Sequence, residues 1–92
     1  MVFDRRHRRA SHGHLAIAAD CVVLAREVEH DAAMHQRCAL RAVECGDLVE
    51  AAACVDRADA DLKRARELHE LAANHRRLSS AVGVAEPLTV GA

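Results

Sequence analysis

A chain of 92 residues is long enough for one small domain. It has no Trp or Tyr and only one Phe, so Ala, Val, Leu and Cys must supply the core. The formal net charge of -1 excludes a global attraction to nucleic acid or anionic lipid. These properties predict one domain with a thin core and only local electrostatic contacts.

The first 13 residues are predicted to form a flexible basic arm. The arm contains "RRHRR", which concentrates four of the thirteen basic residues. Such an arm could neutralise a few phosphates of a nucleic acid. The alternative, a solvated tail, stays open because no aromatic side chain accompanies the charges to stack on bases. The candidate nucleic-acid contacts are Arg5, Arg6, Arg8 and Arg9.

Residues 14–78 are predicted to form a helical hairpin. Residues 14–44 contain neither Gly nor Pro and favour one helix. Gly46 suits the left-handed position after a helix end, and Asp47 with Glu50 has the spacing of a capping box that starts a second helix over about 47–77. Gly83 and Pro87 make further helix unfavourable, so residues 79–92 are expected to form a flexible tail.

Alanine recurs every seven residues in both predicted helices. An antiparallel fold about residue 45 places these alanines opposite one another, which predicts an all-α antiparallel hairpin with an alanine seam. The opposing pairs are Ala18 with Ala72, Ala25 with Ala65, Ala32 with Ala58 and Ala39 with Ala51. The same reasoning predicts intervening layers of Cys21 with His69, Val28 with Leu62, His35 with Val55 and Ala42 with Leu48.

An alanine seam buries little apolar area, so the hairpin is expected to need a partner. A symmetric dimer of hairpins, forming a four-helix bundle, would supply it. One predicted face for this contact comprises Ile17, Leu24, Asp31, Cys38 and Cys45 on the first helix, with Asp47, Cys54, Asp61, Leu68 and His75 on the second. A second apolar strip, on the opposite flank, comprises Leu15, Val22, Ala33, Leu40, Ala52 and Val55.

The stretch "GDLVEAAACVDRA" resembles the centre of a tetratricopeptide repeat, within residues 35–58. Gly46, Asp47, Glu50, Ala51 and Ala58 match the turn and the small residues of that repeat. Leu48 stands where the repeat carries an aromatic residue, and no second repeat follows. The resemblance implies a single helix-turn-helix unit that binds a protein or peptide.

A group of potential metal ligands falls on both sides of the predicted seam. Spacings of four and three residues place Asp31, His35 and Cys38 on one helix face, and the hairpin brings Cys54 and Asp61 towards them. Thiolate, imidazole and carboxylate groups are ligands for zinc or copper. The alternative is that the cysteines pack as small apolar residues and that no cofactor is bound.

No arrangement in the chain predicts an enzyme. Cys21 beside His69 could form a nucleophile and base, but nothing in the sequence indicates an oxyanion hole or substrate pocket. The cysteines lack CxxC spacing and no export signal is convincing, so a cytoplasmic protein with reduced thiols is expected. No stretch is long and apolar enough for the membrane.

The sequence therefore predicts a homodimeric helical module that binds a protein partner or regulates one. A soft-metal-binding helical bundle is the alternative of a different class. Nucleic-acid binding through the basic arm is a third.

Overall fold

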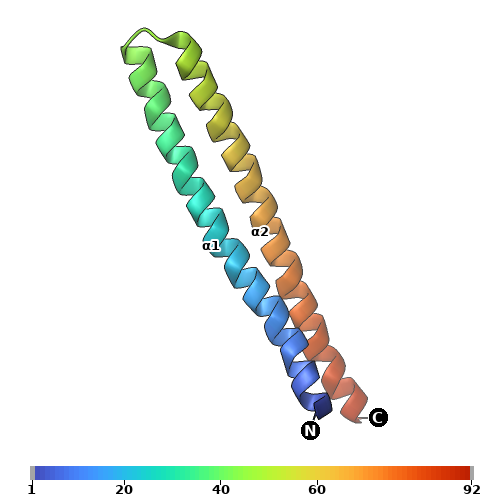
Figure 1. The fold of residues 1–92 in the computed structure, drawn as a ribbon. Helices are drawn as coiled ribbons and strands as arrows, with labels where there is room; N and C mark the ends of the chain where they lie inside the picture. Colours follow the sequence, from blue (N-terminus) through green and yellow to red (C-terminus); the bar gives the residue numbers. More distant parts are fainter. Residues whose placement is uncertain (1, 92) are drawn as a thin grey trace. The chain divides into compact units, whose positions relative to one another are not determined.

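The computed structural model describes the backbone of residues 2–91 and the side chains of residues 13–81. It contains two helices, α1 (Val2–Glu44) and α2 (Leu48–Gly91), joined by a short turn (Figure 1). They pack antiparallel as a hairpin, which confirms the predicted all-α hairpin. In the described part of the chain, neither helix has a span long and apolar enough to cross a membrane.

Both helices extend beyond the expected bounds of 14–44 and 47–77. Gly13 lies inside α1, where its missing side chain weakens the helix without preventing it. Ser79 is buried, seven residues after Ala72, so it extends the column of small residues in α2. The helical backbone also passes through Gly83 and Pro87. Nothing is described of the side chains in most of the predicted arm and tail.

The turn between the helices is built from two adjoining caps. Gly46 adopts a φ of 78°, the left-handed conformation that favours glycine. Its N–H donates to the Val43 carbonyl at 2.9 Å, and the Asp47 N–H donates to the Ala42 carbonyl at 2.8 Å. These two bonds define a Schellman motif, which satisfies carbonyls at the end of α1. The predicted role of Gly46 is thus confirmed.

Asp47 caps the start of α2, but the capping box is only half formed. The Glu50 N–H donates to Asp47 Oδ1 at 3.0 Å, as expected of an N-cap. The return bond would require the Asp47 N–H, which already donates to the Ala42 carbonyl. The Glu50 carboxylate is therefore available for other contacts.

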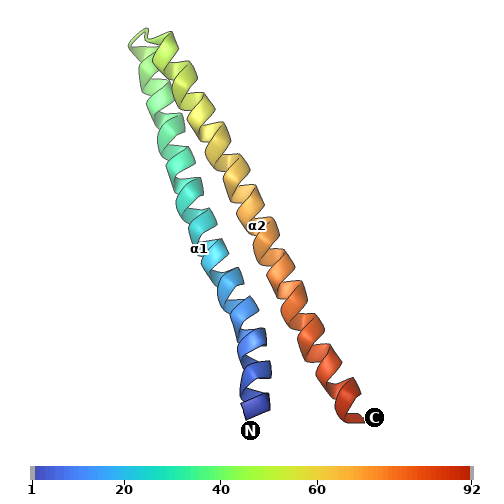
Figure 2. The ribbon, with the colours of Figure 1, turned by 45° about the vertical axis from the view of Figure 1, so that its right-hand side comes forward.

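The chain divides into two compact units, each containing a stretch of both helices. Unit 2 comprises Val23–Leu68 and includes the turn. Within it, α1 and α2 lie side by side along the alanine seam (Figure 2). The buried residues of this unit are small apart from one leucine: Ala25, Ala32, Ala39, Ala51, Cys54, Ala58, Ala65 and Leu68. Such residues allow a close approach of the two backbones but bury little area.

Unit 1 comprises the residues up to Val22 and those from His69 onward. Its core is smaller still. Ala18, Cys21 and Ala72 form a buried cluster against which Val22 packs. This unit therefore repeats the same pattern of alanine and cysteine across the two helices.

The second core column of α2 differs from the expected one. In unit 2, Cys54 and Leu68 are buried, whereas Leu48 and Val55 are exposed. The second core column of α2 thus lies three residues after each seam alanine, as the second core column of α1 also does. The physical reason is that both helices have the same handedness, so the step from the first core position to the second is the same in each. Cys54 and Leu68 consequently belong to the hairpin core and not to an outer face.

Two glycines in different conformations should respond oppositely to alanine. Gly46→Ala should lower the free energy of unfolding by about 1 kcal/mol, because a side chain disfavours positive φ. Gly13→Ala should raise it by about 0.5–1 kcal/mol, since Gly13 is helical with open space around it. Urea denaturation followed by circular dichroism at fixed protein concentration would measure both. Gly46→Asn should lose less than Gly46→Ala, and equal losses would contradict the assigned turn.

The close approach of the helices predicts a strong position dependence for larger side chains. Ala58 is 1% exposed in the seam, so Ala58→Leu should destabilise the hairpin by about 1–3 kcal/mol through overpacking. Ala60 is exposed on the same helix and provides the matched control. Ala60→Leu should change stability by less than about 0.5 kcal/mol. Comparable effects in thermal denaturation would contradict the seam.

Candidate functional site

The five predicted metal ligands all fall within unit 2. The structure brings them together in part: one imidazole–carboxylate pair, two thiols with charged neighbours, and an exposed aspartate. The residues concerned are Asp31, His35, Cys38, Cys54 and Asp61.

His35 and Asp61 form a polar pair across the hairpin. His35 Nδ1 lies 2.8 Å from Asp61 Oδ2, at hydrogen-bond distance. The two side chains are 33% and 27% exposed, so the pair is shielded but not sealed from water. Each residue lies three positions after a seam alanine, Ala32 or Ala58, in the second core column of its helix. A polar pair at core positions favours one alignment of the two helices over its shifted alternatives.

Cys54 lies in the core of unit 2 beside two charged groups of its own helix. The Cys54 thiol donates to Glu50 Oε1 at 3.5 Å. Arg57 Nη1 lies 3.7 Å from Cys54 Sγ and 3.3 Å from the same glutamate oxygen. The half-formed cap explains this arrangement, because the carboxylate that does not return to Asp47 instead accepts from the thiol and the guanidinium.

The surroundings of Cys54 favour its protonated form. Burial is the largest cause that raises the pKa of this thiol above its ordinary value of 9.0, and the Glu50 carboxylate raises it further by hydrogen bonding and charge. The Arg57 guanidinium acts in the opposite direction and the neighbouring Cys38 in the same one. Reactive, nucleophilic cysteines ordinarily have a lowered pKa, whereas these surroundings hold the Cys54 thiol in its protonated form.

Cys38 provides the second thiol on the facing helix. It is half-buried, and Arg41 Nη2 lies 3.6 Å from its sulfur. The charge of Cys38 is the smallest of the causes that raise the pKa of Cys54. Each of these two sulfur atoms thus has a guanidinium group beside it. Cys45, in contrast, is exposed at the turn.

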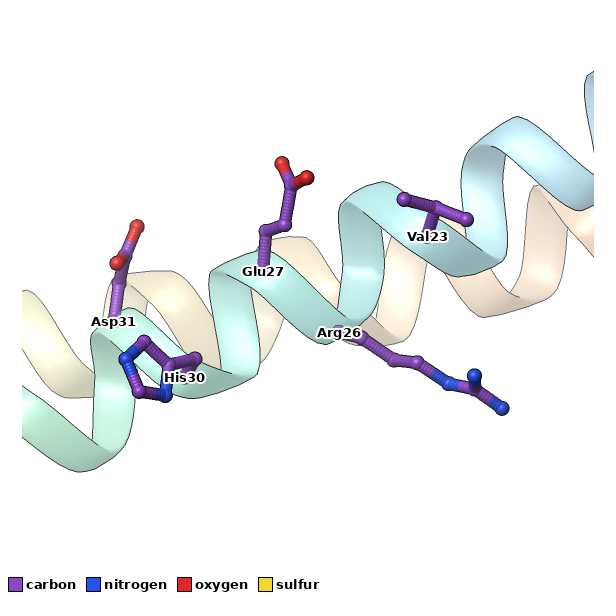
Figure 3. Close-up of a pocket in the computed structure, with 5 residues that line it drawn as sticks. All are labelled: Val23, Arg26, Glu27, His30 and Asp31. Atoms are coloured by element: carbon purple, nitrogen blue, oxygen red, sulfur yellow. The ribbon is translucent and has the colours of Figure 1, made fainter.

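Asp31 lies on the outward side of α1, beside a shallow depression (Figure 3). Five side chains of this helix line the depression: Val23, Arg26, Glu27, His30 and Asp31. Glu27 and Asp31 extend to one side and Arg26 to another. Because no residue of α2 contributes to the lining, this feature is an open surface and not an enclosed substrate site.

The described side chains do not form a conventional metal site. No group of three or more His, Cys, Asp or Glu residues among them is placed to hold a metal ion. A structural zinc site requires four ligands. The predicted zinc or copper site stays a prediction, and a four-ligand version of it would require groups from a second chain.

A second polar pair, made of two histidines in unit 1, was not identified from the sequence. His14 Nδ1 lies 2.9 Å from His75 Nδ1, and the ring centroids are 5.2 Å apart. One ring must donate and the other accept in such a contact, so at least one imidazole is neutral. His75 lies three residues after Ala72 and His14 seven before Cys21, so the core column of each helix contains one of them. Placing the second core column of α2 three residues after each seam alanine would have predicted this pair from the sequence.

Two further predicted site residues, Cys21 and His69, both lie in unit 1. Cys21 is buried whereas His69 is exposed. The side chains of Arg5, Arg6, Arg8 and Arg9 lie outside those described, so the nucleic-acid prediction is untested.

No protein-family model, curated protein or solved structure matches this chain. The resemblance of residues 35–58 to a tetratricopeptide unit stays a prediction.

The pKa of Cys54 should respond to its charged neighbours in opposite directions. Glu50→Gln should lower that pKa because it removes a carboxylate, and Arg57→Gln should raise it because it removes a cation. The Cys54 ¹³Cβ chemical shift, followed against pH by NMR, would measure both.

The raised pKa also makes a prediction about stability. The folded protein binds the Cys54 proton more tightly than the unfolded chain does. The contribution of this proton to the free energy of unfolding is therefore complete below pH 9.0 and decreases as pH rises above that value. Glu50→Gln should weaken that decrease. An unchanged pKa in both variants would contradict the described contacts.

Proposed function

We propose that the chain is a small helical interaction module that functions as a homodimer and catalyses no reaction. The observation that supports this proposal is the contrast between a core of small residues and an exterior with many exposed aliphatic side chains. None of the larger side chains among the described residues is fully buried.

The small core explains why a partner is expected. Burying apolar area contributes about 25 cal/mol per Å², and an alanine offers little of it. Ordering the backbone costs about 1–2 kcal/mol per residue, so a hairpin joined by alanines gains from any further apolar contact. A second copy is always available to provide that contact and needs no separate gene product.

One flank of unit 2 has the composition expected for such a contact. We call Val43, Leu48, Val55 and Leu62 the apolar strip. Heptad positions place the four on the same flank. Val43 lies four residues after Ala39, Val55 and Leu62 lie four residues after Ala51 and Ala58, and Leu48 lies seven residues before Val55. Val43, Leu48 and Val55 are 53%, 68% and 46% exposed, and Leu62 is half-buried.

A second copy fits this strip better than a different partner of comparable size. The strip runs along both helices, so a two-fold axis between two hairpins would pair it with itself and form a four-helix bundle. The α1 positions that continue the flank, Glu29 and Gln36, are long polar residues that can cover the rim of such a contact. The exposed aliphatic area would then become a shared core.

Sedimentation equilibrium of the whole protein tests the proposal. The wild-type chain is expected to show twice the 10.0 kDa mass of one chain. Leu48→Lys and Val55→Lys should each weaken the dimer, because a charge in the contact would lose its hydration. The same variants should lower the thermal midpoint as dissociation exposes the thin core.

Val49 provides the matched control. It neighbours Leu48 but is 84% exposed and lies outside the strip. Val49→Lys introduces the same charge and should leave the dimer unchanged. A wild-type protein that stays monomeric across a wide range of concentrations would overturn the proposed dimer, and equal weakening by Val49→Lys would overturn the assignment of the strip.

A further inference from the structure

Two histidine rings from opposite helices meet in unit 1. His14 belongs to α1 and His75 to α2, and their Nδ1 atoms lie 2.9 Å apart. The ring planes are tilted by 34°, with centroids 5.2 Å apart. Both side chains are half-buried. The two nitrogen atoms are therefore in direct contact at a position that water can still reach.

A cation could take the place of the proton that the two rings share. A neutral imidazole has one N–H and one nitrogen lone pair, so one ring donates through Nδ1 and the other accepts. When each ring instead carries its proton on Nε2, both Nδ1 lone pairs are directed into the same space. Two such lone pairs at this distance would repel each other. A cation bound to both would remove that repulsion.

The separation of the two nitrogen atoms fits a particular coordination geometry. Metal–imidazole bonds are about 2.05 Å long, so a nitrogen–nitrogen distance of 2.9 Å corresponds to an angle of about 90° at the metal. Tetrahedral zinc with bonds of that length would need the nitrogen atoms about 3.3 Å apart. Angles near 90° are typical of the tetragonal complexes that Ni(II) and Cu(II) form with nitrogen and oxygen ligands.

We propose that His14 and His75 chelate one divalent ion of tetragonal geometry, Ni(II) or Cu(II), through their Nδ1 atoms. Among the described side chains no group of three His, Cys, Asp or Glu is placed to hold a metal ion, so water supplies the remaining ligands. The half-buried position of the two rings admits that water.

Binding requires no change in the total number of protons on the neutral pair. The donating ring exchanges its Nδ1 proton for one on Nε2 through water, and the accepting ring already carries its proton there. Two metal–nitrogen bonds form, and two water molecules leave the ion. No oxidation or reduction occurs.

An ion at this position would join α1 to α2 where the core is small. The buried cluster of unit 1 consists of Ala18, Cys21 and Ala72, with Val22 packed against it. Residues of this size bury little apolar area. The two histidines are 61 positions apart in the sequence, so the folded chain should bind the ion more tightly than the unfolded chain. The ion should therefore stabilise the fold.

Isothermal titration calorimetry with nickel chloride tests the proposal on the full chain, with a reductant that contains no thiol. Ni(II) is the probe because Cu(II) can oxidise the four free thiols. The wild-type chain should bind one Ni(II) at its tightest site. His14→Gln and His75→Gln should each weaken this binding by at least about 10-fold, because one imidazole no longer has a second at high effective concentration.

Two further measurements identify the ligands. Ni(II) should raise the thermal midpoint of the wild-type chain and leave the midpoint of either glutamine variant unchanged. X-ray absorption at the nickel edge of the wild-type protein should show two imidazole ligands, oxygen at the other positions and no sulfur. Glutamine can still donate a hydrogen bond, and circular dichroism checks that each variant remains helical.

His30 and Cys21 provide matched controls. His30 is an exposed imidazole of α1 in unit 2, so His30→Gln removes the same group from a different place. Cys21 is the buried thiol of unit 1. His30→Gln and Cys21→Ala should both retain the Ni(II) affinity of the tightest site.

Three results would overturn the proposed site. The first is Ni(II) affinity that is unchanged in a folded His14→Gln or His75→Gln variant; loss in His14→Gln alone would place the ligands on α1. The second is nickel bound by sulfur. The third is a rise in the sedimentation mass when Ni(II) is added, which would indicate a site between chains. The site uses two residues of one chain, so these outcomes do not depend on the proposed dimer.

Discussion

The close approach of two helices along their alanine columns is the constraint on which the structure depends. Alanine permits this approach because it has the smallest side chain that still favours a helix. Every residue three positions after a seam alanine then lies towards the opposite helix, half-buried or buried. Histidine, aspartate and cysteine occupy several of these positions, so the same geometry that makes the core thin also brings polar and sulfur groups together.

The turn and the Cys54 thiol of unit 2 are connected through one carboxylate. The left-handed Gly46 directs the Asp47 N–H towards the end of α1, where it donates to the Ala42 carbonyl. Glu50 cannot complete a capping box with a donor already in use, and its side chain contacts Cys54 and Arg57 instead. A local competition for one hydrogen bond thus determines the electrostatic surroundings of a buried thiol.

The polar pairs of the two units have different physical character. His35 and Asp61 can carry opposite charges, whereas His14 and His75 require one neutral ring to share a hydrogen bond. Both pairs lie where an apolar residue would bury more area. Their benefit is specificity, since a shift of one heptad would place His35 opposite Cys54 or Leu68 instead of Asp61.

The sequence by itself determined the helices, the turn and the antiparallel alanine seam, because seven-residue spacing and glycine chemistry are local properties of the chain. It paired His35 with Val55, whereas the structure pairs His35 with Asp61 and leaves Val55 exposed. The step to the second core column of α2 was predicted in the wrong direction, so Val55 was expected inside and Leu68 outside. That step is itself a local property, because both helices have the same handedness. Only the tertiary structure decided which polar side chains meet, since the alignment of one helix along the other brought His35 to Asp61 and His14 to His75.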